Sequence, residues 1–97
     1  MPAQRKSNLD LVFFALSDPT RRAIVRQLVK GPSSVGELSE PFRDEMTPPA
    51  ISRHLRVLES AQLISQERVG KQRICTFVNK PVSIVTDFLD ELENEPQ

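Results

Sequence analysis

The sequence predicts a mainly α-helical domain that carries one small β-hairpin, and three observations lead to this fold class. Thr47 and Pro48 open an amphipathic segment with a capping side chain and a proline that suits the first helical position. Apolar residues recur with helical spacing in four further segments. A turn at Gly70 has β-branched residues on both sides, which is typical of a hairpin. The length of 97 residues suits a single domain over residues 1–97.

The segment that follows Thr47 is predicted to be a helix with one buried and one exposed side. Ile51, Leu55 and Leu58 recur at i, i+4 and i+7, so they form a stripe that faces a core. The opposite side carries Pro49, Arg53, Arg56 and Ser60. A narrow basic face of this kind suits a helix that enters the major groove of DNA. An ordinary solvated helix would show the same pattern, so the neighbouring elements must decide.

The first helix is expected over residues 8–16, after an arm at residues 1–7 that is expected to be disordered. Its apolar residues lie on most sides of the helix, so it must be covered nearly all round. Burial within the core of one chain satisfies this pattern. Cover by a partner subunit satisfies it equally, because a domain of 97 residues has little material to spare.

Two shorter helices are expected before the amphipathic segment. Asp18 can cap a helix over residues 19–30, and the glycine that follows suits a helix end. Ser34 and Glu37 have the spacing of a capping box, which predicts a third helix over residues 35–40.

The C-terminal half is predicted to hold the hairpin and a last helix. Its strands are expected over residues 64–69 and 72–78, and the last helix begins at Lys80, with residues 95–97 disordered. Three basic residues cluster near the hairpin tip: Arg68, Lys71 and Arg73. A helix-turn-helix followed by a basic hairpin is a winged helix-turn-helix, in which the hairpin, or wing, reaches the DNA backbone beside the groove.

Charge is unevenly distributed along the chain although the net charge is zero. Residues 21–30 carry four basic residues and no acid, and residues 48–80 carry six basic residues against two acids. Residues 81–97 carry five acids and no base. Such segregation can place a basic face opposite an acidic one, and phosphate binding depends on the local field. A solvated surface with an acidic tail is the alternative.

Composition argues against several other classes of protein. The single cysteine forms no internal disulfide, which fits a reducing cytoplasm. No signal peptide and no run of transmembrane length is recognisable. One histidine, one cysteine and no glycine-rich phosphate loop give no nucleophile–base pair, so an enzyme is not expected.

Three segments resemble the ArsR/SmtB family of bacterial winged-helix repressors. They are ALSDPTRR at residues 15–22, ELSEPF at 37–42 and PAISRHLRVL at 49–58, and the similarity runs from about residue 9 to residue 92. The resemblance implies a cytoplasmic homodimer whose first and last helices form the interface. Such a dimer binds double-stranded DNA at a palindromic operator and blocks transcription.

Candidate DNA-contacting residues follow from the resemblance by position. They are Thr47, Pro48, Pro49, Ser52 and Arg53 on the helix, with Arg68, Lys71 and Arg73 on the wing. Arg56 shares the outward face, whereas His54 lies at its edge, where packing or hydrogen bonding at the core boundary and contact with DNA both stay open. Many relatives have polar residues where the two prolines stand, so hydrogen-bonded base reading is lost there. Contact with a thymine methyl group remains available.

The expected dimer interface combines apolar residues of the first and last helices. They are Leu9, Val12, Phe13 and Leu16, together with Val85, Phe88, Leu89 and Leu92.

The metal sites of the family have no counterpart in this sequence. The third helix lacks cysteine and the last helix lacks histidine, so the chain resembles the non-metal-sensing branch, whose members often repress their own operons. We therefore expect no metal and no cofactor. Two alternatives stay open: a winged helix used as a protein-interaction module, and a repressor that responds to a small molecule at a site the sequence does not locate.

Overall fold

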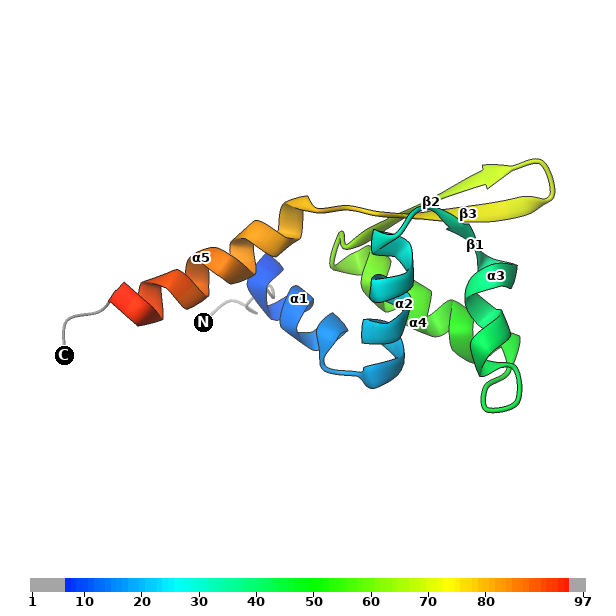
Figure 1. The fold of residues 1–97 in the computed structure, drawn as a ribbon, viewed down its shortest axis with the longest axis horizontal. Helices are drawn as coiled ribbons and strands as arrows, with labels where there is room; N and C mark the ends of the chain where they lie inside the picture. The colour runs from blue at the N-terminus through cyan, green and yellow to red at the C-terminus, as the bar shows by residue number, and fades with distance from the viewer. Residues whose placement is uncertain (1–6, 95–97) are drawn as a thin grey trace, which may run out of the picture.

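The computed structural model describes residues 7–94 (Figure 1), so the disorder expected at residues 1–6 and 95–97 lies outside the described part. Its elements in chain order are α1 (Asn8–Leu16), α2 (Pro19–Val29), β1 (Ser33–Ser34), α3 (Val35–Ser39), the 3-10 helix η1 (Glu40–Phe42), α4 (Pro48–Ser60), β2 (Ile64–Val69), β3 (Gln72–Phe77) and α5 (Lys80–Asn94). The predicted fold class is confirmed.

Capping side chains start α2, α3 and α4 where the sequence predicted them. Thr47 accepts a hydrogen bond from the Ala50 backbone N–H and precedes a proline at the start of α4. The expectation of disorder over residues 1–7 was wrong at its last residue, because Ser7 caps α1. Its hydroxyl accepts from the Asp10 N–H, and the Asp10 carboxylate accepts from the Ser7 N–H. This reciprocal pair satisfies two backbone donors that a helix start leaves free.

The sheet contains a strand that the sequence analysis did not predict. The two-residue strand β1 adds to the hairpin, giving an antiparallel sheet of order β1-β3-β2. Ser33 pairs with Cys75 and Ser34 with Ile74. Because β1 immediately precedes α3, this pairing ties the helix-turn-helix to the base of the hairpin.

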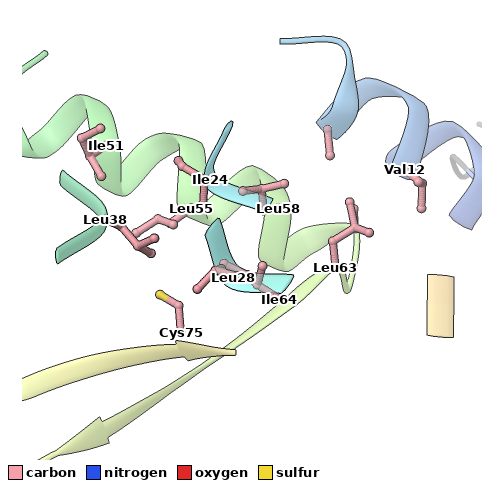
Figure 2. Packing of buried hydrophobic residues seen from close by; sticks show 12 residues of the cluster. Val12, Ile24, Leu28, Leu38, Ile51, Leu55, Leu58, Leu63, Ile64 and Cys75 are labelled. Atoms are coloured by element: carbon pink, nitrogen blue, oxygen red, sulfur yellow. The ribbon is translucent and has the colours of Figure 1, made fainter. Parts of the chain in front are cut away.

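The core lies between α2, α4 and the sheet. Ile51, Leu55 and Leu58 line the inner side of α4, as predicted, and Figure 2 shows Leu55 and Leu58 beside Ile24 and Leu28 of α2. Leu38 of α3 and Cys75 of β3 complete the buried cluster from the other sides. Burial raises the pKa of the Cys75 thiol, so this side chain acts as a small apolar residue of the core.

Helices α1 and α5 pack together at the end of the molecule opposite the hairpin tip (Figure 1). The rings of Phe13 and Phe88 meet edge to face, with centroids 6.0 Å apart. The placement of Val12 in a dimer interface was wrong, because its side chain is 0% exposed within the protomer and belongs to the core. Within residues 7–94, no helix has the length and apolar character needed to cross a bilayer.

Candidate nucleic-acid interface

The outward face of α4 is exposed as the sequence predicted. Its exposed residues include Thr47 at the cap, followed by Pro48, Pro49, Ser52, Arg53 and Arg56. The buried stripe on the inner side fixes the rotation of the helix about its axis, so this polar face must point away from the core. A helix of 13 residues held in this way is a rigid rod of a width that a major groove admits.

The hairpin presents its basic residues beside α4. A two-residue turn joins β2 to β3, and Gly70 begins it with φ at 63°, a conformation that costs glycine little. Arg68 lies directly opposite Arg73 in the strand register. Like charges at paired positions repel each other, so this arrangement is unfavourable in the isolated protein. An anion between or beside the two guanidinium groups would relieve the repulsion.

A groove of about 410 Å³ separates α4 from the hairpin. Its polar walls include Ser52, Arg56 and Glu59 from α4, Lys71 and Arg73 from the hairpin and turn, and Ser34 at the start of α3. A neighbouring hollow of about 350 Å³ is lined by Glu59, Gln66, Arg68 and Arg73. The structure therefore brings four predicted contact residues, Arg56, Arg68, Lys71 and Arg73, to one connected surface. Arg53 lies on α4 outside both hollows.

The cations of this surface lack acidic partners within residues 7–94. Within that range, an ion pair joins Arg43 to Glu40 at 3.0 Å, and the Asp18 carboxylate lies 3.9 Å from Nδ1 of His54, so neither contact involves a cation of this surface. Glu59 lines both hollows without coming within ion-pair distance of an arginine or lysine. Exposed basic side chains that no carboxylate neutralises are suited to phosphate oxygens, which accept charge-assisted hydrogen bonds.

His54 lies away from the groove and is half-buried. Its Nδ1 is 3.0 Å from a guanidinium nitrogen of Arg21, on α2. Of the two roles left open for this histidine, the observed contact supports hydrogen bonding at the core boundary.

The structural role of Arg21 was not predicted from the sequence, where this residue belongs to a basic segment and to the stretch ALSDPTRR without an assigned contact. The side chain is buried, with 8% of its surface exposed. The sequence contained a signal for this burial, because Ile24 and Leu28 follow Arg21 by three and seven residues. Arg21 therefore falls on the apolar stripe of its own helix.

No cluster with the composition of a metal site occurs in the part of the chain that the structure describes, where no three His, Cys, Asp or Glu residues gather. Cys75 is fully buried, and Nδ1 of His54 accepts a hydrogen bond from Arg21.

Comparison with known proteins agrees with this geometry. A family model described as a helix-turn-helix domain matches residues 16–67. The chain is 43% identical over 88 residues to the transcriptional repressor SdpR of Bacillus subtilis, covering 87% of this chain and 96% of that protein. It is 43% identical over 65 residues to the HTH-type transcriptional regulator Rv2034 of Mycobacterium tuberculosis, covering 67% of this chain and 59% of the length of that regulator. A crystal structure of an ArsR family transcriptional regulator superimposes with a TM-score of 0.85 at 36% identity, over 90% of this chain and 93% of the other.

Proposed function

The chain belongs to the ArsR family of winged helix-turn-helix transcriptional regulators, which bind DNA, and from this premise we propose that it acts as a homodimeric repressor. The dimer would bind an inverted-repeat operator in the cytoplasm, with α4 of each protomer in a major groove and each hairpin against the flanking backbone. The similarity to a protein named as a transcriptional repressor supports repression as the outcome of binding.

The observation that carries the DNA-binding site is the unpaired positive charge around the groove between α4 and the hairpin. Arg56 and Arg73 line it from opposite walls, and Lys71 stands at the hairpin turn. A phosphate backbone lying along this groove would neutralise these side chains together and would offset the repulsion between the two opposed arginines.

Base reading is assigned to the exposed residues of α4 that lie outside the groove. Arg53 has the geometry to donate two hydrogen bonds to a guanine edge, the commonest specific contact in a major groove. Pro48 and Pro49 are exposed at the start of α4 and offer apolar surface to a thymine methyl group.

The dimer is supported by the apolar surface that α1 and α5 leave uncovered. Phe13 is 42% exposed, Leu89 45% and Leu92 55%. These side chains lie on the two helices that pack together at one end of the molecule. A two-fold axis through this surface would join the same apolar patch of both protomers, and this symmetry would match that of an inverted repeat.

The test is a salt titration followed by selection of binding sites. Affinity for sheared genomic DNA should fall as a power of the salt concentration, with a slope of about −0.9 for each phosphate that the protein neutralises. Selection from the same fragments should enrich sequences with two-fold symmetry. A salt-independent signal, or enrichment of no DNA sequence, would favour the protein-interaction module instead.

A further inference from the structure

Arg21 connects three helices through hydrogen bonds from each of the three nitrogens of its guanidinium group. Its Nε donates to the Ala15 carbonyl at 2.7 Å, and Nη2 donates to the Phe14 carbonyl at 3.0 Å. Its Nη1 meets Nδ1 of His54 at 3.0 Å. A charge buried to this extent is tolerated only when its donors find acceptors, so each of these contacts matters to the position of the side chain.

The charge of this arginine is balanced by a helix end. Both carbonyl acceptors belong to the last turn of α1, where the aligned peptide dipoles leave partial negative charge. The guanidinium carbon also lies 5.2 Å from the centre of the Phe14 ring, a cation–π distance. Arg21 is therefore fixed to α1 from two sides, and its Nη1 is directed to His54 on α4.

The hydrogen bond from Arg21 to α4 determines which ring nitrogen of His54 carries the proton. Arginine can only donate, so Nδ1 of His54 must accept, which leaves the ring proton on Nε2. Asp18 does not compete for Nδ1, because its carboxylate oxygen is 3.9 Å away, beyond hydrogen-bond length. Among the described residues, no other side-chain hydrogen bond joins α4 to α1 or α2. Apart from Arg21, the buried residues of these three helices are apolar, and apolar contacts lack the directionality of a hydrogen bond.

We infer that His54 is a positioning residue, which acts through Arg21 and does not touch DNA. The buried stripe sets the rotation of α4 about its own axis, and Nδ1 of His54 sets the tilt of α4 against the end of α1, a helix that carries part of the surface proposed for the dimer. In a dimer on an inverted repeat, the two recognition helices must lie about 34 Å apart, so a small change in the angle of each misplaces both. The effect on DNA rests on the proposed function, whereas the hydrogen bond itself does not.

A pair of amide substitutions separates this role from direct DNA contact. The Asn side chain places its oxygen near Nδ1 of histidine, and the longer Gln side chain reaches the position of Nε2. His54→Asn should therefore keep the wild-type affinity for the selected operator. His54→Gln and His54→Leu should each lose about tenfold, because they leave a buried donor of Arg21 without its acceptor. Retained affinity in His54→Gln with loss in His54→Asn would assign His54 to DNA contact and overturn the inference.

A second measurement uses the DNA-free protein, so it does not depend on the operator. The chain has a single histidine, and its ring nitrogen resonances need no assignment among several. The 15N spectrum should show an unprotonated Nδ1 and a protonated Nε2, and residual dipolar couplings should show α4 reoriented against α2 in His54→Leu but not in His54→Asn. A proton on Nδ1, or an unchanged α4 in His54→Leu, would overturn the inference.

Failure of the proposed function would look different. A wild-type protein that binds no selected DNA, yet shows the expected ring nitrogens and dipolar couplings, would count against the repressor and leave the role of His54 in place. As a matched control, Arg53→Ala should weaken operator binding. The 15N spectrum of the His54 ring and the residual dipolar couplings of α4 should stay as in the wild type.

Discussion

At the scale of single residues, Gln62 is the residue at which the chain departs from ordinary backbone geometry. Its φ is 61°, and within the described chain it is the one non-glycine residue with positive φ. Gln62 closes α4, because its N–H donates to the Glu59 carbonyl. The N–H of the next residue, Leu63, donates to the Leu58 carbonyl. This pair of bonds is a Schellman motif, a helix end at which glycine is usual.

We expect Gln62→Gly to stabilise the protein. A side chain in the left-handed region costs roughly 1 kcal/mol, and the more flexible unfolded chain of the glycine variant returns part of that gain. Gln62 is exposed, so the substitution removes no buried contact. The melting temperature should rise by up to about 4 °C. Gln62→Ala, which keeps the Cβ, is the control and should show no such rise; an equal rise in both variants would contradict the explanation.

Asp18 links stability to pH. Its partial burial alone would raise the pKa, but the hydrogen bond from the Arg21 N–H and the positive charge of the Arg21 guanidinium outweigh this, so the pKa of Asp18 lies below its usual value. A carboxyl whose pKa is lower in the folded state adds stability above its unfolded pKa, and this stability is lost as the pH falls through the folded pKa.

Two variants distinguish the charge of Asp18 from its capping role. Asp18→Asn can still cap α2, so the wild type should exceed it in stability at neutral pH, with the difference disappearing in acid. Asp18→Ala loses the cap as well and should cost about 1 kcal/mol at neutral pH. Urea unfolding at both pH values gives these differences. A gap between wild type and Asp18→Asn that stays constant in acid would show that the charge is not responsible.

At the scale of secondary-structure elements, the sequence predicted those whose signals are local. The amphipathic stripe and Thr47 cap predicted α4, and Gly70 predicted the hairpin turn, because each signal acts within a few neighbouring residues. Strand β1 has no such signal, since two serines become a strand only by pairing with β3. The apolar stripe of α2 could have indicated that Arg21 is buried, but not its hydrogen-bond acceptors, because α1 and α4 meet this side chain only when the core forms.

The groove shows the same limit for the functional residues. Composition could identify the basic residues of α4 and of the hairpin, but not which of them would share a surface. The antiparallel register places Arg68 opposite Arg73, and the packing of α4 turns Arg56 toward them and leaves Arg53 outside. This arrangement leads to different expected roles for individual cations.

Substitutions on the two elements should therefore have different effects on DNA binding. Arg53→Ala should cost about 1–3 kcal/mol on the operator and relax sequence preference, because Arg53 is assigned to base edges. Lys71→Ala should weaken binding to all sequences alike and reduce the salt slope by about one, because Lys71 is assigned to phosphate. Titration of cognate and random DNA at several salt concentrations measures both. The same loss on cognate and random DNA for both variants would contradict the assignment.

At the scale of the whole molecule, regulation by zinc-like ions has no chemical basis in the described residues. A switch needs several converging ligands, and no three His, Cys, Asp or Glu residues gather within residues 7–94. We expect operator affinity to be unchanged by chelator and by one zinc ion per protomer. A tenfold drop with zinc that chelator reverses would reveal a site formed in another way, for example across the dimer.

The shape of the molecule separates its two proposed surfaces. The basic hairpin projects at one end, whereas α1 and α5 lie at the other (Figure 1). A partner on the apolar surface would therefore leave the groove between α4 and the hairpin open. The exposed outer residues of α5, Asp87, Asp90 and Glu91, carry negative charge at the same end, which would repel a DNA backbone and favour the basic end as its contact.

Leu89→Glu tests whether this apolar surface holds the dimer. Leu89 is 45% exposed within the protomer, so a carboxylate there leaves the core filled, whereas in a dimer it would bury an unpaired charge. Sedimentation at micromolar concentration should show a folded monomer in place of the dimer, and tight operator binding should be lost with it. Val29→Glu is the matched control, because Val29 is 61% exposed but lies on α2, and it should remain dimeric. A dimeric Leu89→Glu variant, or a monomeric wild type at that concentration, would show that protomers do not meet through α1 and α5.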